Sequence, residues 1–130
     1  MITNYLKGKK VGISRGFYKT GELKVKLICK DGKEFTYYIS GELESEYQWV
    51  DNFKQGKYVI YFKSGKIKYE SYYIDNVLQG KYKFYYESGN LEQEGTLVDG
   101  VKQGKVFFYY ESGLIKTELD MIDNKNNIPK

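Results

Sequence analysis

Residues 56–79 read GKYVIYFKSGKIKYESYYIDNVLQ, and residues 80–103 read GKYKFYYESGNLEQEGTLVDGVKQ. Both stretches begin with Gly-Lys, continue through an aromatic run to a Ser-Gly pair, and then carry a Glu and an Asp in the same register. The period is 24 residues, because Gly-Lys recurs at 56 and 80 (80 − 56 = 24). Self-similarity at a fixed period of this length is the sequence signature of a repeat architecture.

The same pattern extends in both directions along the 130-residue chain. Gly-Lys also occurs at 32 and 104, and Ser-Gly at 40 and 112. A shorter unit starts at Gly12 and reaches Gly32 after 20 residues (32 − 12 = 20). We therefore predict one repeat domain over residues 12–123, with an N-terminal cap at 1–11 and a polar tail at 124–130. The predicted units are 12–31, 32–55, 56–79, 80–103 and 104–127.

Each unit is predicted to form a β-hairpin. In the unit at Gly56, an aromatic and β-branched run precedes Ser64-Gly65, a second such run follows, and Asp75-Asn76 opens the connection to the next unit. Ser-Gly suits either a two-residue turn or the end of a three-residue loop with a glycine bulge. The hydrophobic pattern favours the two-residue turn. With a two-residue turn, one face of the hairpin carries the apolar residues Tyr58, Ile60, Phe62, Ile67, Tyr69 and Tyr73. In the next unit the same face carries Tyr82, Phe84, Tyr86, Leu91 and Leu97.

Five successive hairpins predict an all-β fold, in which repeated antiparallel β-hairpins with a 24-residue period form an elongated, twisted single-sheet meander. The chain has 15 Tyr, 7 Phe and 1 Trp but no Ala, a composition that favours strands over helices. Because the open edges of such a sheet can pair with other chains, the lysine-rich residues 1–11 are expected to cover the first edge.

The composition argues against an enzyme. The chain has no His, so the commonest general acid–base group and metal ligand are missing, and Cys29 is the only Cys. The Glu and Asp residues recur once in every unit, whereas a catalytic pair would need residues peculiar to one unit. We predict no catalytic residues, no metal site and no cofactor. The chain also shows no apolar leader and no run long enough to span a bilayer, so a cytoplasmic location is expected.

The unit resembles the MORN repeat variant, and the match is carried by Tyr85, Tyr86, Gly89, Leu91, Glu94, Gly100 and Gly104 with their equivalents. Bacterial proteins built from this repeat are grouped as YwqK-type antitoxins. The resemblance implies hairpins stacked into an elongated sheet, a protein–protein interaction role, and neutralisation of a partner toxin. The alternative is a structural repeat scaffold that self-associates through its end hairpins.

A row of tyrosines is the candidate partner-binding site. Tyr is a large, rigid contact residue with a polar tip, and identical residues on successive hairpins form a ladder. The competing interpretation is that these rings pack over lysine stems and that their hydroxyls donate hydrogen bonds to Glu46, Glu70, Glu94 and Glu118. The expected partner is another protein, with a homo-oligomer through sheet edges as a second option. Nucleic acid and membrane are not expected, because the net charge is only +4 and acidic and basic residues alternate. The row consists of Tyr37, Tyr61, Tyr85 and Tyr109.

Overall fold

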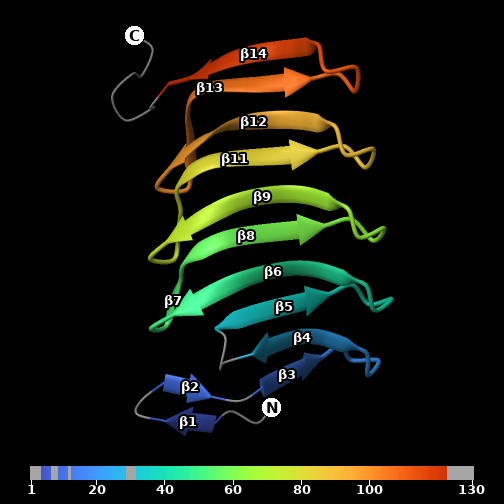
Figure 1. The fold of residues 1–130 in the computed structure, drawn as a ribbon, viewed down its shortest axis with the longest axis vertical. Coiled ribbons are helices and arrows are strands. Elements are labelled where there is room, and N and C mark those ends of the chain that lie inside the picture. The colour runs from blue at the N-terminus through green and yellow to red at the C-terminus, as the bar shows by residue number, and fades with distance from the viewer. Residues whose placement is uncertain (1–3, 7–8, 12, 29–31, 123–130) are drawn as a thin grey trace.

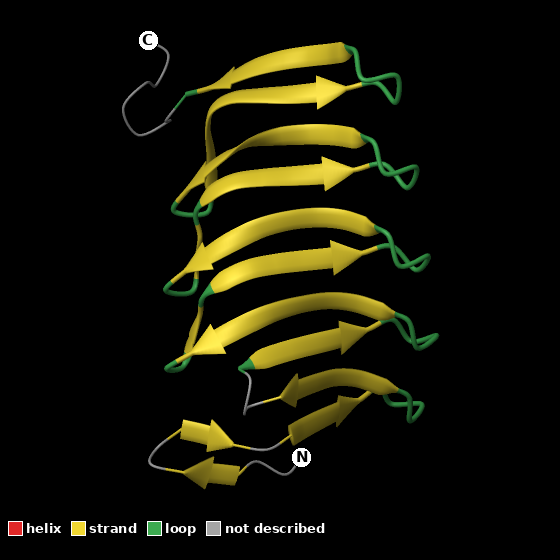
Figure 2. Cartoon of the chain, viewed as in Figure 1, coloured by secondary structure: helices red, strands yellow, loops and turns green. Residues whose placement is uncertain are grey.

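A computed structural model describes residues 4–6, 9–11, 13–28 and 32–122 of the chain. In these residues every regular element is a strand, as the sequence predicts (Figure 2). Cys29, Asp123 and the predicted tail at 124–130 lie outside the described residues.

Ten strands form the body of one open antiparallel sheet, stacked in chain order along the long axis (Figure 1). They pair as five hairpins, with the hairpin loops on one side of the sheet and the connecting turns on the other. This arrangement confirms the predicted meander. The strands are β3 (Ile13–Phe17), β4 (Leu23–Ile28), β5 (Lys33–Tyr37), β6 (Leu43–Val50), β8 (Gly56–Tyr61), β9 (Ile67–Ile74), β11 (Gly80–Tyr85), β12 (Leu91–Val98), β13 (Val101–Tyr109) and β14 (Ile115–Met121).

Four short strands accompany this body. β1 (Asn4–Leu6) and β2 (Lys9–Val11) pair with each other as a separate two-stranded sheet. β7 (Phe53–Lys54) and β10 (Val77–Leu78) belong to the connections between hairpins and pair with the ends of β6 and β9. Together with the ten strands of the body, β7 and β10 make the main sheet twelve-stranded.

The connections after β6, β9 and β12 turn at two-residue loops in which both residues have positive φ. Asp75 and Asn76 have φ of 47° and 71° between the paired residues Ile74 and Val77, and Asp99 and Gly100 have φ of 52° and 79°. Positive φ at both positions identifies type I′ turns, whose twist matches that of the flanking strands. Asp, Asn and Gly tolerate this conformation, which explains why they recur here.

The hairpin loops have three residues, so the predicted two-residue Ser-Gly turn is wrong. In the third hairpin, the Phe62 amide donates to the Lys66 carbonyl at 2.8 Å and the Gly65 amide donates to the Phe62 carbonyl at 2.9 Å. Gly65 has φ of 93°, the left-handed conformation that the third loop position needs. The same pair of hydrogen bonds closes all five hairpin loops.

A β-bulge next to each loop restores the predicted pairing in the rest of the hairpin. Ile60 pairs with Tyr69, as a two-residue turn would require, but Tyr61 pairs with Ile67, so Lys68 is the extra residue. The predicted face is therefore right for Tyr58, Ile60 and Tyr69. It is wrong for the first residue of the returning strand in both hairpins, because Ile67 and Leu91 lie opposite Tyr61 and Tyr85.

The hydrophobic core is an aromatic cluster on the face that carries Tyr58 and Ile60. Tyr69, Tyr82 and Leu97 are buried, and Tyr58, Ile60, Leu78 and Phe84 pack against them. The Tyr69 and Phe84 ring centroids lie 4.5 Å apart. The centre of a one-layer sheet is thus covered by its own large side chains, which lie across neighbouring strands.

Candidate functional site

Tyr37, Tyr61, Tyr85 and Tyr109, the tyrosine row, are the last residues of β5, β8, β11 and β13. Each side chain is half-buried, and each stands beside a hairpin loop. The row therefore follows the long axis of the sheet, one tyrosine per hairpin, as the 24-residue period predicts.

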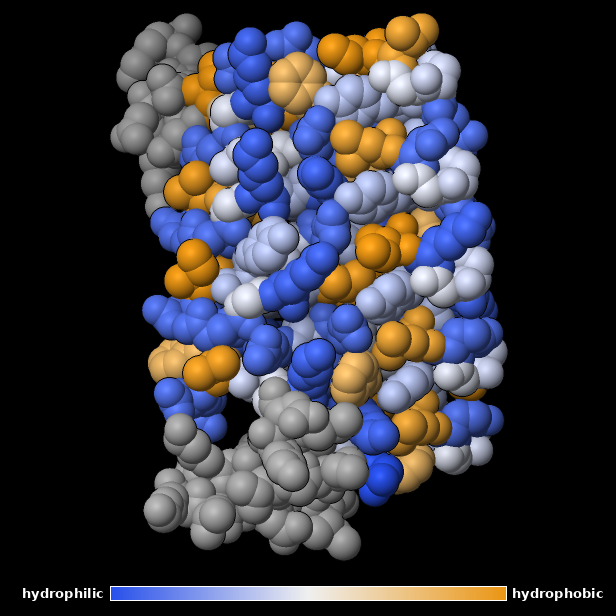
Figure 3. Space-filling view, viewed as in Figure 1, coloured by the Kyte–Doolittle hydropathy of each residue, from blue (hydrophilic) through white to orange (hydrophobic). Residues whose placement is uncertain are grey.

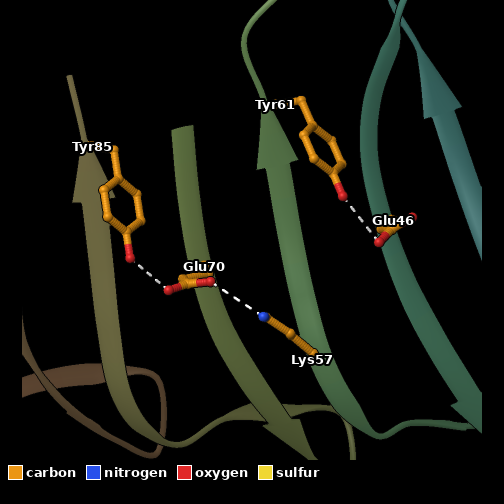
Figure 4. Close-up of polar contacts among 5 residues, drawn as sticks. All are labelled: Glu46, Lys57, Tyr61, Glu70 and Tyr85. Atoms are coloured by element: carbon orange, nitrogen blue, oxygen red, sulfur yellow. Dashed lines mark hydrogen bonds and ion pairs between the residues drawn. The ribbon is translucent and has the colours of Figure 1, made fainter. Parts of the chain in front are cut away.

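Three tyrosines of the row donate to a glutamate of the preceding hairpin. The hydroxyl-to-carboxylate distances are 3.0 Å for Tyr61–Glu46, 2.6 Å for Tyr85–Glu70 and 2.5 Å for Tyr109–Glu94. The first two bonds are drawn in Figure 4, with Lys57 Nζ 3.4 Å from Glu70 on the side away from Tyr85. The rings are thereby held in place and link adjacent units.

Tyr37 differs from the other members of the row. The residue that corresponds to Glu46, Glu70 and Glu94 in the first hairpin is Lys26, which pairs with Phe35. The tyrosine–glutamate contacts of the competing interpretation are therefore found for three of the four tyrosines, whereas Glu118 forms an ion pair with Lys105.

These contacts bear on the pKa values of Tyr61, Tyr85 and Glu70. Burial, reinforced by the accepting carboxylates, raises the pKa of Tyr61 and of Tyr85 to about 12. Burial of Glu70 acts against its ionisation, but the hydrogen bond from Tyr85 and the Lys57 ammonium outweigh it and lower the pKa of this carboxyl. Near neutral pH each pair is a neutral phenol bound to a carboxylate, which is a charge-assisted hydrogen bond.

Each tyrosine of the row also faces an aliphatic residue across the hairpin. On the face shown in Figure 3, hydrophobic and weakly polar side chains alternate along the long axis near the hairpin loops, beside a band of hydrophilic ones. Phe17 and Ile115 are the most exposed members, at 59% and 57%. We call these five pairs the aromatic–aliphatic strip: Phe17–Leu23, Tyr37–Leu43, Tyr61–Ile67, Tyr85–Leu91 and Tyr109–Ile115.

A second set of tyrosines locks adjacent hairpins through the backbone. The hydroxyls of Tyr18, Tyr38 and Tyr86 each donate, at 2.6 Å, to the backbone carbonyl of the tyrosine-row residue in the next hairpin. In the third hairpin this position is Phe62, which has no hydroxyl to donate.

Phe62→Tyr is expected to stabilise the chain by about 0.5–1.5 kcal/mol, because its hydroxyl would reach the Tyr85 carbonyl as Tyr38 reaches that of Tyr61. The reverse change, Tyr86→Phe, should destabilise by a similar amount. Urea denaturation of the two variants and the wild type measures both effects. Equal urea midpoints for all three proteins would show that these hydrogen bonds make no net contribution to stability.

The face opposite the tyrosine row holds a group of aromatic residues that the sequence interpretation did not treat as a site, although it assigned one of them, Tyr73, to the apolar face. Tyr47 and Trp49 of β6 and Tyr73 of β9 lie around the Lys54 side chain of β7. The sequence does contain a signal for this group, because two of its positions break the 24-residue repeat. Positions 24 and 48 residues after Tyr47 hold Ser and Gly, and the position 24 residues after Lys54 holds Leu. These residues depart from the repeat, whereas the tyrosine row follows it.

Other candidate sites are weaker. A depression on the face of the tyrosine row is lined by Glu70, Tyr72, Lys81 and Lys83. Among the residues that the structure describes, no group of His, Cys, Asp or Glu is placed to hold a metal ion. In the same residues no helix is present that could cross a membrane.

Comparison with known proteins supports the repeat. The family model of the MORN repeat variant matches residues 54–75 and 78–99, and such repeats are generally associated with protein or membrane interaction. No curated protein matches the chain. The crystal structure of TarM is similar over 91% of this chain, at 17% sequence identity and a TM-score of 0.41. The chain spans 21% of that structure's length.

Proposed function

We propose that the chain is a non-enzymatic protein-binding module that contacts its partner through the aromatic–aliphatic strip. The observation that carries this proposal is the continuity of the strip across all five hairpins. Ten strands spaced at about 4.8 Å make it roughly 40 Å long. A surface of that length is sufficient for a specific interface of standard size.

The tyrosine–glutamate bonds suit this role. Binding usually costs free energy because interface side chains lose rotamer freedom, and rings that are already fixed avoid much of that cost. The hydroxyls of Tyr61, Tyr85 and Tyr109 are satisfied within the sheet, so the ring faces and the neighbouring aliphatic side chains are what a partner would contact. The contact would be mainly apolar, with the charged band beside it as a rim.

The most specific form of the proposal is an antitoxin or immunity protein that binds a cognate toxin in the bacterial cytoplasm. It is supported by the resemblance of the repeat and by the strip. Another protein remains the proposed partner rather than nucleic acid or a membrane. The net charge is +4, and Lys57 and Lys105 form ion pairs with Glu70 and Glu118 on this face.

The test compares two lysine substitutions in one strand. A partner captured with the wild-type chain is titrated against Ile67→Lys and Ile74→Lys by calorimetry. Ile67 lies in the strip and is 37% exposed, whereas Ile74 lies at the far end of β9 and is 56% exposed. We expect Ile67→Lys to weaken binding at least tenfold, about 1.4 kcal/mol, because it places a charge within an apolar contact.

Ile74→Lys is the matched control, and it should leave the affinity within twofold. Both variants should stay folded, since each replaced side chain is exposed. Equal affinities for the wild type and a folded Ile67→Lys variant would remove the strip from the binding surface. A loss confined to Ile74→Lys would move the surface to the connecting turns.

Self-association through a sheet edge is the second candidate, and one observation favours it. All seven residues of β14, the last strand of the sheet, are exposed. An uncovered edge strand offers its unpaired backbone groups to another chain. Sedimentation equilibrium over a range of concentrations tests this alternative, which requires a dimer that a Thr117→Pro substitution in β14 abolishes.

A further inference from the structure

Lys54 lies in a cage of aromatic rings on the face opposite the tyrosine row. Its Nζ is 4.6 Å from the ring centroid of Tyr47, 5.3 Å from that of Tyr73 and 5.6 Å from that of Trp49. All three distances fall within the range at which an ammonium is attracted to an aromatic face. Tyr58 completes the cluster, with its centroid 5.5 Å from Tyr47 and 5.4 Å from Tyr73.

Two walls of this cage are held by one carboxylate on the neighbouring strand β5, where Glu34 pairs with Tyr47. Glu34 Oε1 accepts from Trp49 Nε1 at 3.2 Å, and Glu34 Oε2 accepts from the Tyr47 hydroxyl. Both carboxylate oxygens are thus engaged with the rings themselves. Glu34 adds negative charge to the cage without forming an ion pair with Lys54 in the described part of the chain.

The backbone of Lys54 is also held in place. Its amide donates to Asn76 Oδ1 at 2.7 Å, and its carbonyl accepts from the Asn76 amide at 3.0 Å. Lys54 therefore enters the cage from a fixed backbone, while its four-carbon stem leaves the ammonium free to exchange with another cation.

The chemistry of the cage suits an alkylated ammonium better than the lysine it holds. A primary ammonium carries three N–H donors, and within the residues that the structure describes the Lys54 ammonium contacts ring faces rather than acceptors. A quaternary ammonium has no donor to satisfy, and aromatic cages are a recurring way to bind it.

We propose that Tyr47, Trp49 and Tyr73 form a binding site for a quaternary ammonium group, and that Lys54 occupies this site when the ligand is absent. The site goes beyond the protein-binding strip, since it lies on the other face and uses residues that depart from the repeat. The later units lack the set: Ser71 and Gly95 replace Tyr47, and Leu97 replaces Trp49 in the fourth unit. The site is therefore expected once per chain.

The test uses Trp49, the sole tryptophan, as a fluorescent reporter within the cage. Tetramethylammonium chloride is titrated at constant ionic strength into the wild type, Lys54→Ala and Lys102→Ala. Lys102 is the matched control, because its Nζ lies 5.6 Å from the Tyr82 ring in another unit. We expect saturable binding that is at least tenfold tighter in Lys54→Ala than in the wild type, and unchanged in Lys102→Ala.

Two further measurements separate charge recognition from apolar filling. The uncharged analogue 3,3-dimethylbutanol should bind Lys54→Ala at least tenfold more weakly than choline does. Tyr73→Leu in the Lys54→Ala background should abolish saturable binding while circular dichroism shows a folded sheet. Failure of Lys54→Ala to bind tetramethylammonium in a folded state, or equal binding of the uncharged analogue, would overturn the proposal. Neither outcome bears on the strip, which Ile67→Lys tests separately.

Discussion

Tyr82→Ala is expected to destabilise the chain by about 3–5 kcal/mol, the range for removing a large aromatic side chain from a core. Tyr82 is 1% exposed and lies in the centre of the aromatic cluster, 6.4 Å from Tyr69 and 5.9 Å from Phe84 between ring centroids. Its hydroxyl donates to Gln93 Oε1 at 2.7 Å, so the substitution also removes a hydrogen bond.

The cavity left by this substitution cannot close easily. Tyr82 pairs with Gly95, and the ring lies so close that a Cβ on Gly95 would be 2.8 Å from Tyr82 Cε1. Removing the ring leaves a glycine opposite an alanine, and in the part of the chain that the structure describes the ten strands of the body form one sheet with no second layer over it. We therefore expect the loss of unfolding free energy to lie near the upper end of the range of about 3–5 kcal/mol.

Tyr72→Ala is the matched control for Tyr82→Ala. Tyr72 is in β9 on the other face, and its side chain is 46% exposed. Its removal should change the free energy of unfolding by no more than about 0.5 kcal/mol, as for most surface substitutions. Urea denaturation followed by circular dichroism measures both variants. Similar losses for Tyr82→Ala and Tyr72→Ala would show that the cluster is not the core.

Raising the pH from 10 to 12 is expected to unfold the protein. Burial raises the pKa of four tyrosines to about 12, namely Tyr58, Tyr61, Tyr82 and Tyr85. Tyrosine in an unfolded chain ionises near about pH 10. Above that pH the unfolded chain loses protons that the folded chain retains, so the stability present below pH 10 falls as the pH approaches 12.

The two signals to compare are tyrosinate absorbance at 295 nm and circular dichroism, both recorded against pH. The buried tyrosines should ionise in the same transition in which the sheet unfolds. In Tyr61→Phe/Tyr85→Phe the dependence of stability on pH in this window should be shallower, since two of the shifted groups are gone. Full ionisation of a chain that stays folded at pH 12 would contradict this account.

The sequence was sufficient to predict the strands and their order. The 24-residue spacing of Gly-Lys and Ser-Gly located every hairpin from 32 to 122, and β9 ends where Asp75-Asn76 was predicted to open the connection. These features depend on local turn preferences and on period-two alternation, which a single chain displays directly. The contact of the tyrosine row with glutamates had been raised only as the interpretation that competes with partner binding.

The sequence interpretation was wrong about the loop and therefore about one residue in each hairpin. The pattern of apolar residues fits the body of the hairpin whether a two-residue turn connects the strands or a three-residue loop is followed by a bulge. Only the register shows that Lys68 is the extra residue and that Ile67 faces Tyr61. Because of this shift, each tyrosine of the row lies opposite an aliphatic residue, and the pairs together form the aromatic–aliphatic strip.

The sequence by itself determined the repeated features, namely the hairpins, their stacking order and the tyrosine row, because each unit follows the same local turn and strand preferences as its neighbours. Only the tertiary structure decided which side chains of different units contact one another. Lys54 of β7 lies among the rings of Tyr47 and Trp49 of β6 and of Tyr73 of β9, so this cluster joins three strands and two successive units. Contacts of this kind depend on the register between hairpins, the direction of each side chain and the Glu34 carboxylate, which accepts hydrogen bonds from two of the rings. No period in the chain encodes these quantities, because they arise when hairpins pair side by side.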